Sequence, residues 1–237
     1  MDYQAGMTSE ISGARVRSLR AGETSVDELR ALTKAFGAAE AHFEGDPTEW
    51  AYDSVVVDGD LVIEGNLSTF ERGWATLVVT GSLHVTGHFR DCDDPATAVF
   101  VLGAMRAERV VTSGALCVAG ARVVDELLAG DMGEHSADIR GDVTARFFVP
   151  ENHHFEIGGT LRADALLGDG ADSQVPKRLA KAAKPMPRMK LREILVDDVL
   201  DIYEDDDGNL ENLELLHDEL LARARQGLPI ARSEPSA

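Results

Sequence analysis

One five-residue phrase recurs six times between residues 54 and 167: an aliphatic residue, any residue, glycine, any residue and then usually an apolar residue. Its glycines are 22, 22, 17, 21 and 18 residues apart, counted along Gly59, Gly81, Gly103, Gly120, Gly141 and Gly159. Self-similarity at a spacing of about 20 residues is typical of a repeat architecture and not of a single ligand-binding loop. We therefore expect each copy to form one unit of a stack.

Polar and apolar residues alternate within the copies. Between residues 54 and 68 the polar side chains fall at positions 58, 60, 64 and 66, and the apolar ones at Val55, Val57, Leu61, Ile63 and Leu67. A period of two turns one face of a strand to the core and the other to water. Because one short copy cannot bury a core alone, neighbouring copies must stack in parallel, about 4.8 Å apart. The sequence thus predicts a mainly β fold, a single-stranded parallel β-helix (solenoid) of about six rungs, with glycines at corners or where stacked backbones approach closely.

The repeat also sets the expected boundaries. Residues 1–50 predict an N-terminal helical cap and residues 51–170 the solenoid. Residues 171–190 predict a basic linker that contains prolines, residues 191–227 an acidic segment with helices near 191–203 and 210–225, and residues 228–237 a disordered tail. Helical segments at both ends would cover the open edges of the terminal rungs, so we expect a capped monomer or small oligomer.

Charge limits the classes of partner. The chain has 42 acidic and 23 basic residues and a formal charge of −19, which opposes binding to nucleic acid and to anionic membranes and favours a protein partner with a basic surface. The basic run at 177–192 could bind an anion, but twelve acidic residues follow it between 193 and 222, and attraction between the two runs is the simpler interpretation.

The compartment follows from two further features. No apolar run is long enough for a signal peptide or a membrane-spanning helix. The chain has two cysteines, Cys92 and Cys117, in different contexts, which excludes a disulfide framework and favours a reduced, cytoplasmic setting.

Three copies of the phrase resemble a known family. Residues 56–61 (VVDGDL), 77–83 (LVVTGSL) and 139–143 (IRGDV) are similar to the repeats of the bactofilin-like, polymer-forming cytoskeletal proteins of bacteria. The resemblance covers about residues 54–167 and implies a parallel β-helix without catalytic residues or bound nucleotide that assembles end to end. The longer, uneven rungs and the flanking helical segments depart from that pattern.

Two groups of residues have the residue types of a metal site. His84, His88 and Cys92 are four residues apart, but an extended strand would spread them over more than about 20 Å, so surface histidines are the better interpretation. Residues 203–214 resemble an EF-hand loop, with Asp205, Asp207 and Glu214 at positions 3, 5 and 12. Tyr203 lacks the carboxylate that normally begins such a site, and a solvated acidic turn is favoured over calcium.

Catalysis is not expected. Left-handed β-helix acyltransferases need an unbroken six-residue period, whereas glycines six residues apart occur here only locally, at 59/65, 81/87 and 114/120. We expect no catalytic residue, no cofactor and no firm metal site.

We expect the partner-binding residues in the loops that connect the rungs, which we call excursions, because these loops carry the polar and aromatic residues that the strands lack. The candidates are Phe70, Trp74, Asp93, Asp94, His135, His153 and His154. The leading interpretation is a cytoplasmic, non-catalytic protein-binding scaffold or adaptor. The alternative is an acidic inhibitor or immunity-type protein that neutralises a basic toxin or nuclease. A bactofilin-like polymer and a solenoid acyltransferase are the weaker interpretations.

Overall fold

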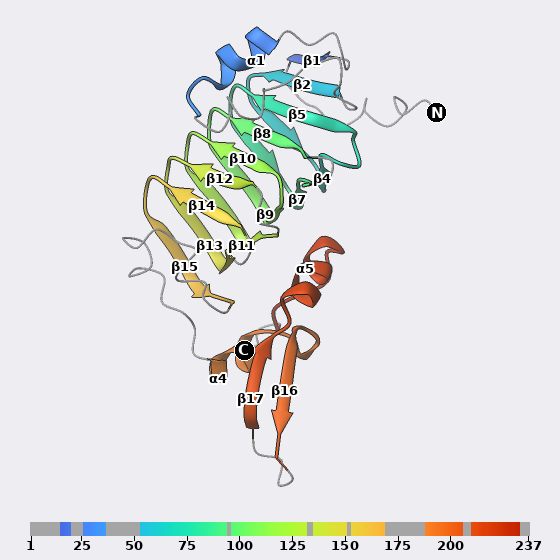
Figure 1. Cartoon of the computed structure of the whole chain (residues 1–237), viewed down its shortest axis with the longest axis vertical. Coiled ribbons are helices and arrows are strands. Elements are labelled where there is room, and N and C mark those ends of the chain that lie inside the picture. Colours follow the sequence, from blue (N-terminus) through green and yellow to red (C-terminus); the bar gives the residue numbers. More distant parts are fainter. Residues whose placement is uncertain are drawn as a thin grey trace.

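The computed structural model describes residues 15–19, 26–36, 53–93, 96–131, 135–150, 153–168, 188–205 and 210–232. Two sheets wind into a solenoid (Figure 1). The first sheet has the strand order β1 (Arg15–Leu19), β2 (Asp53–Asp58), β5 (Trp74–Val79), β8 (Ala98–Val101), β10 (Ala115–Val118), β12 (Ser136–Ile139) and β14 (His154–Ile157). The six strands from β2 to β14 are parallel, one for each rung, so the predicted β-solenoid is confirmed.

The second sheet carries the other wall of each rung. Its order is β15 (Leu161–Leu166), β13 (Val143–Val149), β11 (Arg122–Gly130), β9 (Met105–Thr112), β6 (Leu83–Val85) and β3 (Leu61–Ile63), while β4 (Leu67–Ser68) pairs with β7 (His88–Arg90) and β7 with β9. The first residues of the longer strands pair with one another in parallel, Arg122 with both Met105 and Val143. The final residues of the repeated phrase therefore form one stacked row.

The glycines of the phrase sit where successive rungs come closest. A Cβ on Gly103, Gly120 or Gly141 would lie 2.5–2.7 Å from the carbonyl carbon or oxygen of the glycine in the preceding rung. In the first rung Gly59 has φ +104°, a conformation that favours glycine. The expectation that the glycines mark corners and close backbone approaches is confirmed.

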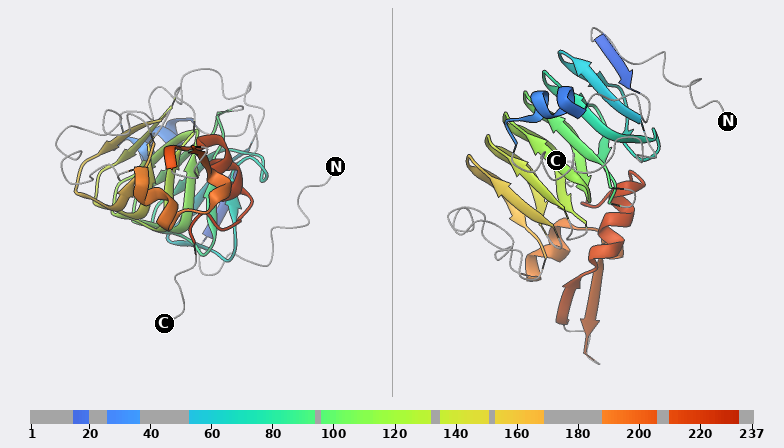
Figure 2. Two further views of the ribbon diagram at one scale, coloured as in Figure 1. Left: turned by 90° about the horizontal axis from the view of Figure 1, so that it is seen from below. Right: turned by 45° about the horizontal axis from the view of Figure 1, so that its top comes forward.

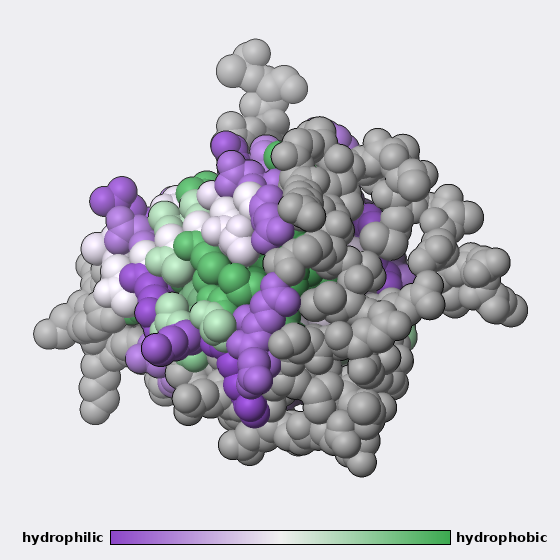
Figure 3. Space-filling view, turned by 90° about the horizontal axis from the view of Figure 1, so that it is seen from above, coloured by the Kyte–Doolittle hydropathy of each residue, from purple (hydrophilic) through white to green (hydrophobic). Residues whose placement is uncertain are grey.

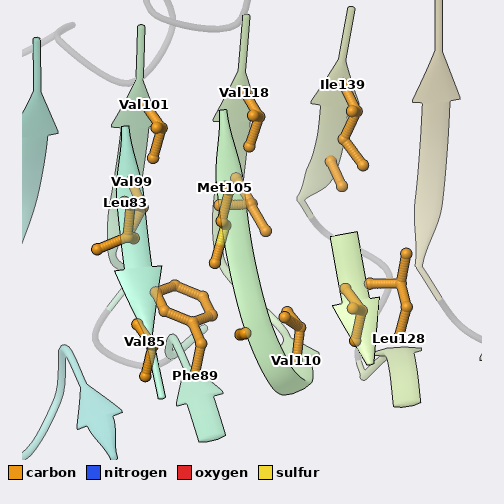
Figure 4. Close-up of a cluster of buried hydrophobic side chains, with 14 of the residues drawn as sticks. Leu83, Val85, Phe89, Val99, Val101, Met105, Val110, Val118, Leu128 and Ile139 are labelled. Atoms are coloured by element: carbon orange, nitrogen blue, oxygen red, sulfur yellow. The ribbon is translucent and has the colours of Figure 1, made fainter. Parts of the chain in front are cut away.

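Alternate side chains of the strands fill the interior between the two sheets. Leu83, Phe89, Val101 and Met105 point inward in Figure 4 and are no more than 1% exposed. They belong to one continuous hydrophobic cluster that runs from Val55 in the first rung to Leu166 in the last. Burial of this continuous apolar row is what holds the rungs together, because a single rung has too little core of its own.

The N-terminal region covers an edge and a face. β1 pairs antiparallel with β2 and so occupies the edge of the first sheet. Helix α1 (Val26–Thr33) lies on the outer face of that sheet, where Leu29 and Phe36 pack against Val78 and Phe100. The edge is thus covered by a strand, whereas a helix over the terminal rung was expected. Figure 3 looks onto this end, where apolar side chains gather between polar ones.

Both ends of the interior are closed. Leu61 and Ile63 of the first rung are 0% exposed, and Ile157 and Leu161 of the last rung are 0% and 2% exposed.

The C-terminal region differs from the helices expected at 191–203 and 210–225. It contains α4 (Arg188–Ile194), a 3₁₀ turn (Asp197–Val199), an antiparallel hairpin of β16 (Leu200–Glu204) and β17 (Leu210–Leu215), and α5 (His217–Arg225). The leucines at 210, 213, 216 and 220 imitate helical spacing, but Leu200 with Ile202 and Leu213 with Leu215 alternate as strands do.

This region packs on the outer face of the second sheet. Leu195 and Leu221 join Leu127 and Phe147 in one buried cluster, and α5 lies beside β9 (Figure 2). Ile230 is 0% exposed in the same cluster, so residues 228–232 are ordered although a disordered tail was expected. Most of the basic linker lies outside the described residues. Arg192, the last residue of the basic run at 177–192, forms an ion pair with Glu204 at 3.2 Å.

Candidate functional site

A cleft of about 350 Å³ opens at one corner of the solenoid, where β7 and β11 end next to the end of α5. We call it the corner cleft. Its lining comes from five stretches that the fold brings together: Phe70, Arg90, Asp91, Cys92, Asp93, Ser113, Asp131 and Arg225. The excursions between rungs and the C-terminal helix therefore meet at one place on the surface.

Asp91 anchors the floor of the corner cleft. Its carboxylate accepts hydrogen bonds from the Thr112 hydroxyl at 2.7 Å and from the backbone N–H groups of Ser113 and Gly114 at 2.6 and 2.9 Å. Burial raises the pKa of Asp91, and these three donors oppose the shift. The carboxylate thereby fixes the tight corner between β9 and β10.

Each arginine of the corner cleft has a carboxylate partner. Arg90 Nη2 lies 2.9 Å from Glu71 Oε1. Arg225 forms an ion pair with Asp131, which joins α5 to the end of β11. Burial and the neighbouring Arg90 lower the pKa of Arg225. The two pairs hold the walls of the cleft in place.

Three of the residues predicted from the excursions gather here. Phe70 and Asp93 line the corner cleft, and Phe70 is 46% exposed. His135 lies with its Nε2 3.2 Å from Asp93 Oδ1. Asp94 lies outside the described residues. The cleft thus presents an exposed aromatic ring and a carboxylate, a combination that can bind a cation.

The other predicted residues lie elsewhere. Trp74 is 4% exposed because it begins β5 and faces the interior, and His153 is 1% exposed and packs edge-on against Phe155, with the ring centroids 5.3 Å apart. These two are core residues and not the surface contacts that were expected. His154 is exposed on β14, in the last rung.

The structure contradicts the helix–loop–helix arrangement that calcium binding at residues 203–214 would need. An EF-hand needs a loop between two helices, whereas Glu204 and Glu214 belong to paired strands and Glu214 lies opposite Asp201. Asp205 follows β16, and Asp207 lies outside the described residues. His84 and His88 fall on two different short strands. Within the described ranges, no group of three or more His, Cys, Asp or Glu residues could hold a metal ion.

A second polar junction lies next to the corner cleft, where the chain leaves α5. The buried Arg109 guanidinium pairs with Glu126 and donates from Nη1 to the carbonyl of Leu228 at 2.8 Å. The His88 side chain is 18% exposed, with its Nε2 4.0 Å from Glu108 Oε2. A Cβ on Gly227 would lie 3.2 Å from His88 Nε2, so the imidazole faces the backbone of the C-terminal segment.

Acid is expected to weaken this junction through His88. Burial and Arg109 lower the pKa of His88, against the opposite effects of Glu108 and Glu126, and Arg225 lines the same small cavity. Because the folded-state pKa of His88 lies below the ordinary value of 6.5, the unfolded state takes up the proton first and stability falls as pH drops through this range.

We therefore expect His88→Gln to lose less stability than the unmodified protein when urea unfolding is compared at about pH 7.5 and 5.5. His84→Gln, at an exposed position of β6, is the matched control. Equal losses in the protein and the His88 variant would contradict the prediction.

Sequence reasoning missed Arg90, Asp131 and Arg225. Arg90 ends β7 and Asp131 follows β11 at the same corner, a position that the repeat could have indicated once the rungs were aligned. Arg225 carries no such signal, because its place at the corner depends on how α5 packs against the second sheet.

The fold and this site define a class of protein: a parallel β-solenoid with an N-terminal helix on one face and a C-terminal hairpin–helix segment on another. No family model, curated protein or solved structure matches the chain. Among the described helices, none is both long and apolar enough to cross a membrane.

Proposed function

We propose that the protein is a non-catalytic, cytoplasmic β-solenoid scaffold that binds a protein partner with a basic surface. The observation that carries the proposal is that both outer faces of the solenoid bind other segments of the chain. An apolar strip on each sheet already binds a segment of the chain itself: α1 lies on the first sheet and the C-terminal segment on the second. Flat sheet faces that receive amphipathic segments are a binding platform.

Charge supports a basic partner. Asp125 and Asp164 are exposed on the outer face of the second sheet, which also carries Arg106, paired with Asp125, and Arg162. Three further carboxylates, Asp60, Glu64 and Asp142, are exposed at the bends between strands. With a formal charge of −19, such a surface steers basic proteins toward the solenoid and repels polyanions.

The test is capture followed by reconstitution. Proteins retained by the immobilised chain from the cells that encode it would be purified and titrated back by calorimetry at about 0.05 and 0.3 M salt. We expect at least one partner of basic pI to bind at fixed stoichiometry, with an affinity that falls about tenfold or more at the higher salt concentration. Failure of every purified candidate to rebind would contradict the proposal.

An inhibitor of a basic toxin or nuclease is the alternative, and the β16–β17 hairpin favours it. The hairpin projects away from the rungs (Figure 1) and carries exposed Tyr203, whose hydroxyl donates to Asp201 at 2.6 Å, with Glu204 and Glu214 also exposed. An exposed aromatic residue among carboxylates is a frequent anchor in tight interfaces. Loss of the partner's enzymatic activity on binding would distinguish inhibition from scaffolding.

End-to-end polymerisation is the weaker interpretation. An antiparallel strand on the edge of the first sheet and closed interiors at both ends disfavour continued parallel stacking. Concentration-dependent filaments in electron micrographs would support it instead.

A further inference from the structure

The charges of the corner cleft do not cancel. The positive charges of Arg90 and Arg225 are matched by Glu71 and Asp131 within the protein. Asp91 is fully buried and both of its oxygens accept hydrogen bonds. Asp93 directs its buried Oδ1 toward His135 Nε2 at 3.2 Å, and the 13% of its side chain that is exposed supplies negative charge in excess of the two arginines.

The side chain of Phe70 lines the corner cleft and is partly exposed to solvent. It is one of four large hydrophobic residues exposed within the described part of the chain, the others being Val123, Tyr203 and Leu228. The face of an aromatic ring attracts a cation, and guanidinium groups stack on it with a gain of about 0.5–2 kcal/mol. A carboxylate next to such a ring adds a charge-assisted hydrogen bond.

We propose that the corner cleft binds a single arginine or lysine side chain presented by a protein partner. This inference rests on the proposed partner-binding function and names the place and chemistry of recognition. The cationic head would lie between the side chains of Phe70 and Asp93. A cleft of about 350 Å³ is large enough for one side chain and too small for a helix.

An anion between the two arginines is the competing occupant. Both guanidinium groups already bind carboxylates, and an anion would have to approach a protein of formal charge −19 past Asp93. The cation is therefore favoured.

A pair of isosteric peptides tests the inference on the full chain. Acetyl-Gly-Arg-Gly-amide and acetyl-Gly-citrulline-Gly-amide differ in the charge of one side chain, and acetyl-Gly-Glu-Gly-amide probes for an anion. We expect the arginine peptide alone to shift the backbone amide resonances of Cys92, Ser113 and Asp131. Equal shifts with citrulline, or shifts with the glutamate peptide only, would overturn the proposal.

Two exposed aromatic residues provide matched variants. Phe70→Ala should weaken binding of the arginine peptide about fivefold, the loss expected from one cation–π contact. Tyr203→Ala, which removes an equally exposed ring on the hairpin, should leave it unchanged, because Phe70 and Tyr203 are 46% and 47% exposed but Tyr203 lies outside the cleft. Because both positions are exposed, both variants are expected to fold.

The two proposals can fail separately. If a reconstituted partner binds the Phe70→Ala and Asp93→Asn variants as tightly as the unmodified protein, the corner cleft is not its site and the scaffold function stands. If the arginine peptide binds but no partner is reconstituted, the cation-binding chemistry of the cleft stands, while its role in partner recognition fails together with the scaffold function.

Discussion

Replacing Arg122 with methionine is expected to stabilise the protein. Arg122 stands at the last position of the repeated phrase, where the other rungs have Leu61, Leu83, Met105, Val143 and Leu161. Its side chain therefore points into the interior and is 0% exposed. Among the residues that the structure describes, none forms a hydrogen bond with the three guanidinium nitrogens of Arg122, and the buried Asp91 is the opposite charge that acts on it. A charge in such a place costs several kcal/mol of desolvation.

Replacement of a whole buried ion pair by apolar residues is neutral or stabilises proteins by about 1–4 kcal/mol, whereas removal of one partner of a bonded pair destabilises them. Arg122 makes no hydrogen bond to Asp91, and Asp91 is held by three other donors, so we expect a gain in the same range. For a chain of this size we expect the midpoint of thermal unfolding to rise by about 4–10 °C. Methionine suits the site because its unbranched stem follows that of arginine, and Met105 already occupies the row in the preceding rung. Asp91 keeps its three hydrogen bonds in the variant.

Arg106→Met is the control, because Arg106 lies on the outer face of the neighbouring strand with 57% of its side chain exposed. It should shift the midpoint by no more than about 2 °C. A lower midpoint for Arg122→Met would contradict the prediction and would show that the Arg122–Asp91 attraction outweighs desolvation.

The stability gained by Arg122→Met is expected to depend on pH. Burial lowers the pKa of the Arg122 guanidinium well below its ordinary range, to about 9. A cationic group with a lowered folded-state pKa destabilises the fold below that pKa, and the penalty is relieved as pH rises through it. The stability difference between Arg122→Met and the unmodified protein should therefore narrow between about pH 8 and 10 in urea titrations. A constant difference would contradict this.

Substituting alanine for Gly141 is expected to be strongly destabilising. A Cβ at this position would lie 2.5 Å from the carbonyl carbon and oxygen of Gly120 and 2.6 Å from the backbone nitrogen of Ala121. Backbone atoms of a stacked rung cannot rotate away as a side chain can, so the rungs must separate locally. Overpacking of this kind costs about 1–3 kcal/mol and more where the surroundings are rigid. We expect the midpoint to fall by about 5–10 °C.

Gly59→Ala is a control variant that introduces backbone strain without a steric clash. A Cβ at Gly59 would have no atom within 4 Å, but its φ of +104° is unfavourable for alanine and should cost about 1–2 kcal/mol. Ala121→Ser, at an exposed neighbouring position, should be nearly neutral. Gly141→Ala that is as stable as the unmodified protein would show that the rungs tolerate separation, contrary to the stacking described here.

The repeated phrase was sufficient to predict the solenoid, because both of its signals are local. Alternation between Val55 and Leu67 fixes which face of a strand is buried, and the glycine spacing fixes where rungs stack. Arg122 shows the limit of this reasoning. It occupies a position of the phrase that is usually apolar, and only the structure shows that its guanidinium is enclosed in the interior with no hydrogen-bond partner among the described residues.

The excursions were predicted less well. Phe70, Asp93 and His135 gather at the corner cleft, whereas Trp74 and His153 are buried. An aromatic residue at the boundary between a loop and a strand can face either the interior or water, and the register of the strand decides which. That register depends on hydrogen bonds to the preceding rung, which the residues of the loop do not encode.

The sequence by itself determined the rung, its inward row and its glycine corners, since these depend on contacts between copies of one short pattern. The tertiary structure alone decided which outer faces are covered, that residues 200–215 form a hairpin, and that Arg225 meets Phe70 at one corner. These features depend on the match of apolar strips far apart in the chain, Leu127 and Phe147 with Leu195 and Leu221 among them. These apolar strips do not recur at a fixed spacing along the chain, so the sequence does not indicate which of them pack together. Only the folded solenoid brings them side by side.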